Sequence, residues 1–434
     1  MFTPQKDDFM TRKTHHIIAL TLLLLSFAYP LFARNESTVY RTQTFKPDIA
    51  SLRIRLKDAS TLERPILHLN GDEVLEISFD QLSHSLHQYT YTLIHLNADW
   101  KPSALSSTDY LQGFTTLDIT DYETSLNTQQ LYTHYQFDFP NDDMTPKVSG
   151  NYAIIIYEDN DPENVISTAC FSIVDPQVHT KITLRGNTDT ELYGHYQQLD
   201  IDLYTDGVQW TQTSDFLLVV QQNNRWDNRV FNPKPTYVEA NRLRFINQRG
   251  LIFEGGNEYR YFDIASTYYM GNNVDKIYFD HNFYHAFLFP SENLSDVSYT
   301  AQYDSNGQFV INAERTDYDD TEADYMWVHF ILPQAIPFSK GEVYVGGDVF
   351  FNKLTPRNKM QYDNEHKCYT LSCFLKQGGY DFQYWYVPYN SRKATTLPIE
   401  GSHYETQNEY RVYVYYRPFG ALYDQLICVE QLGN

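Results

Sequence analysis

The stretch QYTYTLIHLNADWKPS, residues 88–103, changes its pattern halfway along. Every second residue from Tyr89 to His95 falls on one side, which is the period of a β-strand with one buried face. The second half breaks this alternation, and Pro102 cannot donate a hydrogen bond to a neighbouring strand. The stretch therefore predicts a strand over residues 88–96 that leads into a loop carrying Trp100.

The same alternation recurs along the rest of the chain. Period-2 segments are separated by clusters of Gly, Asn, Asp and Pro, which is typical of short antiparallel strands joined by turns. No stretch after the N-terminal region indicates a helix of three or more turns. The 434 residues include 27 Phe, 37 Tyr and 5 Trp, and flat rings pack well on a pleated sheet. The sequence therefore predicts an all-β protein.

The strands group into blocks, each about the size of one immunoglobulin-like sandwich. A turn signal at Asp175-Pro176 ends the first block, and an acidic segment precedes the last. We therefore expect three consecutive immunoglobulin-like β-sandwich domains after a signal peptide. The expected bounds are 1–33 for the signal peptide, 34–177 for the first sandwich, 178–290 for the second, 291–325 for a hairpin turned on Ser305-Asn306-Gly307 with an acidic connector, and 326–434 for the third sandwich.

The N-terminus has the build of a secretory signal peptide. Two basic residues precede an apolar run from Ile17 to Phe27, and Ala28 and Ala33 offer cleavage signals. The run is too short for a comfortable membrane span. The first cysteine is Cys170, so no cysteine near the cleavage point is available to carry a lipid. We predict an exported, soluble protein without a lipid anchor.

The formal net charge of −22 bears on the partners to expect. Such a surface repels phosphate backbones and anionic lipids, so nucleic acid is not expected as a partner. No Gly-x-Ser-x-Gly elbow, nucleophile motif or tunnel-forming pattern with paired acids indicates a hydrolase. We therefore expect no enzymatic activity and no small-molecule substrate.

Two segments contain residue types that bind metal ions. Residues 317–325 read DYDDTEADY, with five carboxylates in nine residues, but they lack the glycine and the closing glutamate of a calcium loop. A solvated connector is the plainer interpretation. His366, Cys368 and Cys373 fall short of a structural zinc site, which takes four ligands in close pairs. No metal or other cofactor is predicted.

Four cysteines in an exported protein invite disulfides. Cys368 and Cys373 lie on one predicted strand with their side chains on opposite faces, so they cannot bridge each other. Two alternatives remain. Either one of them pairs with Cys428, or all four, Cys170 included, are buried free thiols.

Two tryptophans raise the question of carbohydrate binding. Trp226 lies in QNNRWDNR and Trp385 in YDFQYWYVPYN. Exposed aromatic rings stack on sugars, so an aromatic-platform glycan-binding β-sandwich protein is one interpretation. The other places Trp385 in a core, on the same strand face as Gln383. Trp226, between charged and amide side chains, is the more exposed candidate.

Motifs in the first and last parts of the chain carry a resemblance to a known family. The stretch HLNADWKPSALSSTDYLQGF, His95–Phe114, is followed by shorter motifs in the same block and by two near the C-terminus. Together they resemble the type IX secretion system plug proteins, and the resemblance is weakest across the middle block. The further motifs are Tyr132–Tyr135, Phe139–Asn141, Ser149–Tyr152, Ile399–Asn408 and Tyr413–Ile427.

The resemblance implies a periplasmic protein of Bacteroidota, associated with the inner side of the outer membrane. Such a plug is not an enzyme. It binds the periplasmic mouth of the type IX secretion translocon barrel in the outer membrane and seals it when idle, so the barrel is the implied partner. The third block is also similar to glycogen-binding immunoglobulin-like modules, through EVYVGGDVF (Glu342–Phe350) and the turn at Lys376–Tyr380. That is a likeness of scaffold, which does not settle function.

The motifs and the aromatic loops single out two sets of residues. For Trp100 two roles stay open, contact with the partner or a lid packed on the end of the first sandwich beside a turn-forming Asp99. The set expected to bind the partner is Trp100, Trp226, Tyr268, Tyr269 and Asn272. The set that carries the family signature, expected to be structural, is Asp99, Trp100, Pro102, Ser103, Gly113, Gly150, Asn151, Tyr152, Glu400, Asn408, Tyr416, Arg417 and Asp424.

Overall fold

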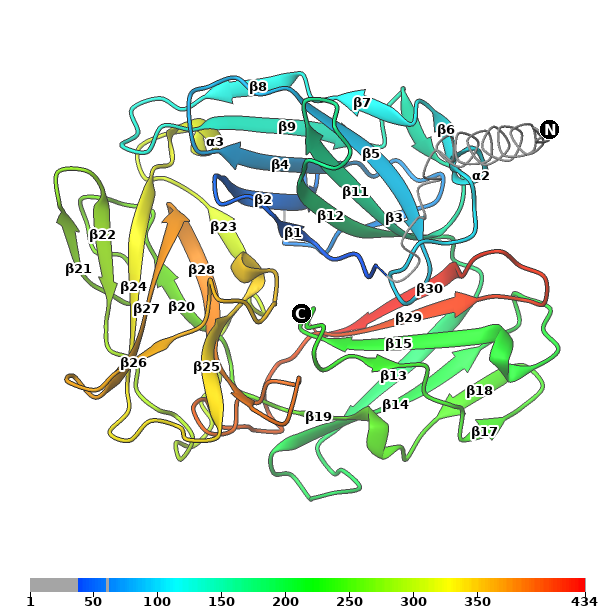
Figure 1. Cartoon of the computed structure of the whole chain (residues 1–434). Coiled ribbons are helices and arrows are strands. Elements are labelled where there is room, and N and C mark those ends of the chain that lie inside the picture. The colour runs from blue at the N-terminus through cyan, green and yellow to red at the C-terminus, as the bar shows by residue number, and fades with distance from the viewer. Residues whose placement is uncertain (1–37, 60–61, 434) are drawn as a thin grey trace, which may run out of the picture. The chain divides into compact units, whose positions relative to one another are not determined.

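The computed structural model describes residues 38–59 and 62–433. The predicted signal peptide, residues 1–33, lies outside the described residues. From Tyr40 onward the chain forms one unit of strands, in which the described helices are single turns (Figure 1). The prediction of an all-β protein is confirmed. Within the described part, none of the helices has the length and apolar character that crossing a bilayer requires.

The first sandwich uses a single continuous part of the chain. Its elements are β1 (Gln43–Thr44), β2 (Ile49–Leu56), β3 (Ile66–His68), β4 (Leu75–Gln81), β5 (Tyr89–Leu96), α2 (Ser107–Tyr110), β6 (Leu111–Gly113), β7 (Thr116–Asp118), β8 (Asp121–Thr124), β9 (Thr133–Phe139), β10 (Met144–Pro146), β11 (Gly150–Glu158) and β12 (Val165–Val174). One sheet has the order β1-β12-β11-β5-β7, with β3 alongside β12, and the other has the order β2-β4-β9-β8. The strands β10 and β6 form a separate pair.

Alternation along β5 explains how this sandwich forms its core. Tyr89, Tyr91 and Leu93 are each 2% exposed and belong to the core between the sheets, as the sequence predicts. Phe79 of β4 and Tyr135 of β9 reach the same core from the opposite sheet, with ring centroids 5.3 Å apart. Burying a large apolar side chain contributes about 1.5–3 kcal/mol. The alternating face of β5 therefore decides which side of the strand lies inside.

The second sandwich is assembled from two separated parts of the chain (Figure 1). Its elements are β13 (His179–Arg185), β14 (Tyr196–Tyr204), η1 (Thr213–Asp215), β15 (Phe216–Gln222), β16 (Val230–Phe231), β17 (Tyr237–Val238), β18 (Arg242–Phe245), η2 (Arg249–Leu251), β19 (Ile252–Glu254), β29 (Tyr410–Tyr416) and β30 (Gln425–Leu432). One sheet has the order β13-β14-β18-β17, with β19 alongside β14, and the other has the order β16-β15-β29-β30. The last two strands of the chain thus close the core of this sandwich.

The third sandwich lies between these two parts in the sequence. Its elements are β20 (Arg260–Asp263), β21 (Val274–Phe279), β22 (Tyr284–Leu288), β23 (Phe309–Ile311), α3 (Asp319–Glu322), β24 (Tyr325–Pro333), β25 (Gly341–Gly346), η3 (Asp348–Phe350), β26 (Gln361–Asp363), β27 (Cys368–Lys376) and β28 (Gly378–Pro388). One sheet has the order β21-β22-β24-β27-β26. In the other, the long strand β28 pairs with β20, β23 and β25.

The predicted bounds of the second and third sandwiches, 178–290 and 326–434, are wrong. A boundary at residue 290 separates β22 from β24, yet these strands pair in parallel within one sheet. A third sandwich that ends at residue 434 includes β29, whose whole length pairs with β15 of the second sandwich. Alternation identifies a strand but carries no information about a partner far along the chain. That each sandwich is immunoglobulin-like stays a prediction.

The segment predicted as a hairpin and acidic connector, residues 291–325, also differs from the prediction. A tight turn does form at Asn306-Gly307, but β23 after it pairs with β28 and with no strand before the turn. The acidic end of the segment binds protein groups, since Asp324 accepts the backbone amides of Gln129 and Gln130 at 2.8 and 3.1 Å. This end is part of an interface with the first sandwich and not a solvated connector.

All four cysteines are free and buried. Cys373 lies in the core of the third sandwich and Cys428 in that of the second, so the alternative in which Cys428 pairs with Cys368 or Cys373 is wrong. Burial raises the pKa of the Cys170 and Cys373 thiols to about 12. Both thiols therefore stay protonated and unreactive near neutral pH.

Candidate partner-binding site

The loop after β5 is a tight turn that holds Trp100 in a fixed direction. Two backbone hydrogen bonds of 2.8 Å close it, from the Trp100 amide to the Asn97 carbonyl and from the Asn97 amide to the Lys101 carbonyl. Asp99 accepts the Lys101 amide at 3.1 Å. Trp100 has a φ of 64°, a left-handed conformation that is unfavourable for a bulky residue. The surrounding contacts must therefore keep it there.

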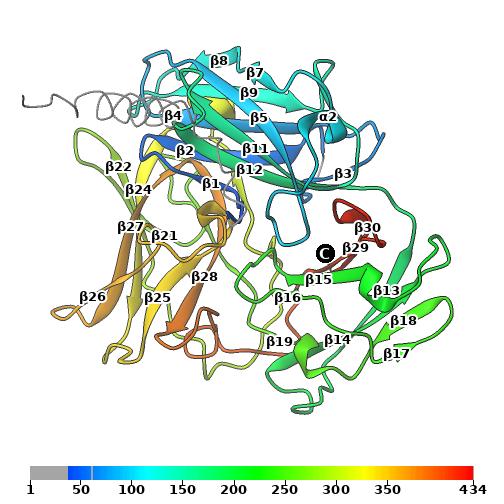
Figure 2. The same ribbon diagram turned by 45° about the vertical axis from the view of Figure 1, so that its right-hand side comes forward.

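The structure brings Trp100 of the first sandwich against Trp226 of the second. Their ring centroids are 5.3 Å apart, and the guanidinium groups of Arg41 and Arg229 lie 4.5 and 4.6 Å from the Trp226 ring. Trp100 also packs beside Cys170 of its own sandwich. Figure 2 shows the loop after β5 reaching from the first sandwich toward β16. Both indoles are half-buried, so this tryptophan pair joins two sandwiches.

A cavity of about 440 Å³ opens beside the tryptophan pair. Arg64 is one of its most buried cations; its guanidinium pairs with Asp348 and lies 3.7 Å from Glu409. Arg411, also in the wall, lies 3.2 Å from the same Glu409 carboxylate. Because these arginines already have carboxylate partners, the cavity offers little unbalanced charge to a ligand.

Residues of the early and late family motifs meet between the first and second sandwiches. Asn151 is completely buried. Its side-chain oxygen accepts the hydroxyls of Ser172 (2.8 Å) and Tyr415 (2.9 Å), and its amide donates to the Asn97 carbonyl (3.1 Å). The early and late motifs that carry the family resemblance are therefore joined in space by β11 and β29.

Three further signature residues fix the hairpin of β29 and β30. Asp424 accepts the Ala98 amide of the first sandwich at 3.0 Å and lies 3.4 Å from the Arg417 guanidinium. The Tyr416 hydroxyl donates to the Gln209 carbonyl at 2.6 Å. These bonds hold the end of the hairpin against both sandwiches.

A buried imidazole, His95, organises the next group of signature residues. Its Nδ1 lies 2.9 Å from the Ser103 hydroxyl, and its Nε2 lies 3.1 Å from the Ser149 carbonyl. Tyr152 packs edge-on against the ring, with centroids 4.9 Å apart. Gly150 has a φ of 145°, and a Cβ there would overlap the imidazole, so only glycine fits without strain.

Two signature residues shape loops of the first sandwich. Pro102 forms a bridge back to Leu96 at the end of β5. Gly113 has a φ of 99°, and a Cβ there would overlap the Asp143 carbonyl. Both residues therefore have a conformational role in these loops.

Glu400 and Asn408 lie in the segment that links the third sandwich back to the second. The Glu400 carboxylate is completely buried, lies 2.8 Å from the Arg260 guanidinium and accepts the Tyr384 amide at 2.7 Å. Asn408 donates to the side-chain oxygen of Gln197 at 2.9 Å. Both signature residues thus have bonding partners inside the protein.

The other predicted partner-binding residues lie on the loop between β20 and β21 of the third sandwich. Tyr268 and Tyr269 are 71% and 58% exposed, and Asn272 is exposed as well. The Arg315 guanidinium lies 4.9 Å from the Tyr268 ring and 5.7 Å from the Tyr269 ring. With the exposed Met270, these residues form what we call the tyrosine patch. The predicted set of five is therefore divided between a half-buried junction and an exposed loop.

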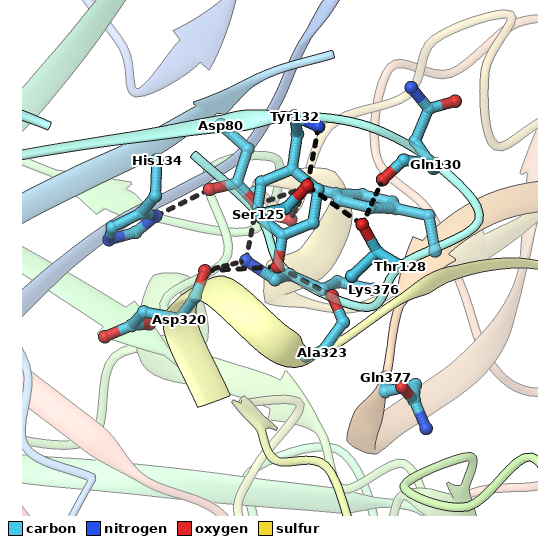
Figure 3. Close-up of polar contacts among 12 residues, drawn as sticks. Asp80, Ser125, Thr128, Gln130, Tyr132, His134, Asp320, Ala323, Lys376 and Gln377 are labelled. Carbon is cyan, nitrogen blue, oxygen red and sulfur yellow. Dashed lines mark hydrogen bonds and ion pairs between the residues drawn. The ribbon is translucent and has the colours of Figure 1, made fainter. Parts of the chain in front are cut away.

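A buried polar network between the first and third sandwiches was not predicted (Figure 3). Asp80 is completely buried; it lies 2.6 Å from the His134 Nδ1, accepts the Tyr325 hydroxyl at 2.7 Å and pairs with Lys376 at 2.6 Å. The Lys376 ammonium also donates to the Asp320 carbonyl at 2.7 Å. Burial alone would raise the pKa of Asp80, but the charge of Lys376 and the contact with His134 outweigh it and hold that pKa well below its usual range. The carboxylate is therefore ionised.

The half-buried Asp304 and the buried Asp381 form a second group of acids, in the third sandwich. Asp304 accepts the amides of Tyr259 and Asn306, and Asp381 accepts that of Ser305. Burial raises the pKa of Asp304 to about 7, with a further contribution from the charge of Asp381. Burial likewise raises the pKa of Asp381 to about 6.

Replacing Asp304 with Asn is expected to flatten the pH dependence of stability. Because the folded pKa of about 7 lies above that of an unfolded Asp, the folded state holds the proton more tightly, and this contribution to stability is lost as the pH rises through 7. Between pH 5 and 7 the native chain should lose about 2 kcal/mol more stability than Asp304→Asn. Urea unfolding at both pH values measures this, with the exposed Asp296→Asn as control. Equal losses in all three chains would contradict it.

The surroundings of Trp226 and Trp385 do not form an open aromatic platform. Within the described residues, no group of three or more His, Cys, Asp or Glu side chains is placed to hold a metal ion. Trp385 is completely buried, with the Arg225 guanidinium 4.5 Å from its ring. The arrangement is that of three sandwiches joined by buried polar contacts.

Comparisons with known proteins agree with this architecture. The family described as type 9 secretion system plug protein 1st domain matches residues 49–175, which run from β2 through β12. The crystal structure at 2.30 Å resolution of a hypothetical protein from Parabacteroides merdae ATCC 43184 is 38% identical, with a TM-score of 0.89 over 92% of this chain and 100% of that chain. A search of curated proteins gives no significant match.

The fold and these matches define an all-β protein whose first sandwich is that of a secretion system plug protein. The chain belongs to the type IX secretion system plug protein family.

Proposed function

We propose that the chain is a non-enzymatic plug that binds the periplasmic mouth of the type IX secretion translocon barrel and seals it when idle. It works in the periplasm, at the inner side of the outer membrane, and its partner is the barrel. Sealing requires occupancy and no chemistry, so the proposal calls for no substrate and no cofactor. Membership of the plug family supports the proposal.

The observation that carries the proposal is the rigid joining of the three sandwiches. The first and third share the buried Asp80–Lys376 ion pair, and the first and second share the bond between Asn151 and Tyr415. The second and third meet where Arg225 covers a buried indole. A buried polar contact resists rearrangement because breaking it leaves an unpaired group. A stopper needs this stiffness to exclude solutes without deforming.

The tyrosine patch is the surface that we propose contacts the barrel. Rigid aromatic side chains are frequent anchors of protein interfaces, because they bury a large area at little cost in conformational entropy. Tyr268 and Tyr269 are both largely exposed and share one cation, Arg315. The tryptophan pair, by contrast, is already occupied in joining two sandwiches.

The double variant Tyr268→Ala/Tyr269→Ala is expected to weaken the complex with the barrel by about 30-fold or more, since an aromatic anchor contributes about 2 kcal/mol. The barrel is purified from cells that carry either version, and the amount of plug retained is measured by mass spectrometry. Leu192→Ala/Tyr193→Ala is the matched control, because both residues are exposed on the second sandwich.

Two different failures are distinguishable. Full retention of the tyrosine variant would rule out the patch as the contact surface and leave the plug function standing. A barrel purified from cells with the native chain, yet without a stoichiometric copy of it, would contradict the plug function itself. Photo-crosslinking from position 268 then identifies whatever partner the patch contacts.

The glycan-binding alternative finds less support in the positions of the tryptophans. Trp385 is 0% exposed. Trp226 lies between Trp100 and two guanidinium groups. A sugar ring stacks on an open aromatic face, and these contacts occupy the faces that such a platform would need.

A further inference from the structure

Each of the three sandwiches contributes one cation to a place beside the tryptophan pair. Arg41 lies shortly before β1 of the first sandwich, Arg229 just before β16 of the second, and Lys353 in the loop after η3 of the third. Both guanidinium groups lie against Trp226, 4.5 Å for Arg41 and 4.6 Å for Arg229 from the ring centroid. The Lys353 ammonium donates to the side-chain oxygen of Gln43, in β1, at 2.5 Å. We call Arg41, Arg229 and Lys353 the basic junction.

The cations of the basic junction have no carboxylate in contact with them. Within the described residues, none of the three forms an ion pair, and the two guanidinium groups donate no hydrogen bond. Two carboxylates attract the arginines from a greater distance, but both are already paired. Asp227 pairs with Arg225 at 2.7 Å, and Asp99 pairs with Lys101 at 3.1 Å. The junction therefore carries three positive charges that the surrounding protein leaves unbalanced.

Burial makes this lack of counter-charges costly. The three side chains are half-buried, so water screens their charges less than it would at the open surface. Burial and the charge of Arg41 lower the pKa of Lys353 to about 8, which leaves its ammonium charged at pH 7. Burial and the same charge also lower the pKa of Arg229. An anion bound at the junction would relieve this repulsion and stabilise the charged form of all three side chains.

The guanidinium groups of the junction are open to a ligand. The guanidinium nitrogens of Arg41 and Arg229 have no hydrogen-bond partner in the described part of the chain, and none of them is completely buried, so they remain in contact with solvent. A guanidinium that packs over an aromatic ring can use its N–H edge for a second partner. That edge is a planar fork that matches the two oxygens of a carboxylate. Two such forks lie against the single indole of Trp226.

A fourth cation extends the positive charge along β1. Arg357, from the same loop as Lys353, donates to the Thr44 hydroxyl at 3.0 Å, and Thr44 directly follows Gln43, the partner of Lys353. The other hydrogen bond of Arg357 goes to the Lys46 carbonyl. The positive charges are therefore spread along β1 and do not converge on one point. This spread suits an extended polypeptide, whose alternate side chains lie about 7 Å apart, better than a compact anion.

The acidity of the whole chain restricts the kind of anion further. The formal net charge is −22, which repels a long polyanion such as nucleic acid or an anionic membrane. A short acidic segment avoids most of this repulsion and still meets the local cations. Charge complementarity at the junction thus favours a few carboxylates on an otherwise neutral polypeptide.

We propose that the basic junction, together with Arg357, binds a short acidic segment of a partner polypeptide in an extended conformation. The Arg41 and Arg229 guanidinium groups donate to carboxylates beside Trp226. The Lys353 ammonium and the Arg357 guanidinium donate to a further carboxylate along β1. Because each sandwich supplies a cation, the bound segment contacts all three. The inference does not depend on the proposed plug function.

The test uses the full chain and three probes. The first is a blocked pentapeptide that alternates glutamate with threonine, the second is the same peptide with glutamine in place of glutamate, and the third is inorganic phosphate. Binding is followed by calorimetry and by the indole N–H resonances of tryptophan-labelled protein. We expect saturable binding of the glutamate peptide with a shift of the Trp226 resonance, and no binding of the glutamine peptide. Added salt should weaken the binding, because it screens the charges.

Matched variants decide whether the basic junction is responsible. Arg41→Gln/Lys353→Gln should weaken binding of the glutamate peptide roughly tenfold or more. Lys181→Gln/Arg249→Gln makes the same change in charge at two exposed residues of the second sandwich and should leave binding unaltered. Thermal unfolding of each variant shows whether it is folded. The single variant Arg357→Gln, at an exposed residue, tests the same site without altering the half-buried cations and should weaken binding about threefold.

Several results would overturn the proposal. Equal binding of the glutamine peptide would show that charge is not recognised, and an equal loss in both double variants would show that the junction is not the site. Saturable binding of phosphate without binding of the peptide would assign the junction to a compact anion. A native dimer in sedimentation that Arg41→Gln/Lys353→Gln dissociates would assign it to a second copy of this chain. No saturable binding of any probe would leave the junction without a ligand.

Discussion

Replacing Lys376 with Met is expected to lower the free energy of unfolding by about 3–5 kcal/mol, because the change leaves Asp80 buried and ionised without its counter-charge. Lys376 is 1% exposed, and its ammonium lies 2.6 Å from the Asp80 carboxylate and 4.2 Å from the centroid of the Tyr132 ring. Urea unfolding at pH 7, followed by tryptophan fluorescence, measures the loss.

Two control variants test whether the loss of stability comes from the buried ion pair. Lys57→Met removes an exposed pair with Asp138 and should change stability little, because exposed pairs are screened by water. Asp80→Asn combined with Lys376→Met removes both buried charges and should recover part of the loss. If Lys376→Met unfolds at the same urea concentration as the native chain, Asp80 is not held ionised by this contact.

Replacing Asn151 with Ala is expected to destabilise the chain by about 2–4 kcal/mol, because two buried hydroxyls lose their acceptor at once. These are the hydroxyls of Ser172 and Tyr415, and the Asn97 carbonyl also loses one of its two donors. The loss should appear in urea unfolding. It should also appear as faster hydrogen exchange along β29, since Tyr415 joins that strand to the first sandwich.

Ser172→Ala is the control for this prediction. It removes one donor and leaves the Asn151 side chain bonded to Tyr415 and Asn97, so it should cost about 1 kcal/mol. A loss in Asn151→Ala no larger than that in Ser172→Ala would mean that the contact between the sandwiches contributes nothing of its own.

Alternation in the sequence was sufficient to find the strands. It identified the buried face of a strand only where one face meets a core and the other meets water. In β5, Tyr89, Tyr91 and Leu93 mark the inner face, and the structure agrees. In β4 the polar face reads as solvent-facing, yet Ser78 and Asp80 are 1% and 0% exposed. The third sandwich covers Asp80 on that face through Tyr325 and Lys376, and a pattern within one strand does not reveal such a neighbour.

The candidate partner-binding site could likewise be predicted only in part from the sequence. The sequence singled out both Trp100 and Trp226, but it could not show that their rings meet 5.3 Å apart. The polar neighbours of Trp226 suggested an exposed ring, whereas Arg229 instead packs on the indole itself. Tyr268 and Tyr269 belong to the predicted partner-binding set, and both are largely exposed in the structure.

The third sandwich is inserted in the sequence between the two parts of the second, and this has a consequence for the synthesis of the chain. β15 emerges from the ribosome early. The strand that pairs with it, β29, emerges only after the whole third sandwich has been synthesised. Until then one edge of β15 has no partner strand, and unpaired strand edges of this kind are prone to aggregate. A nascent chain that stops before Tyr410 would therefore lack both β29 and β30, and its second sandwich could not form completely.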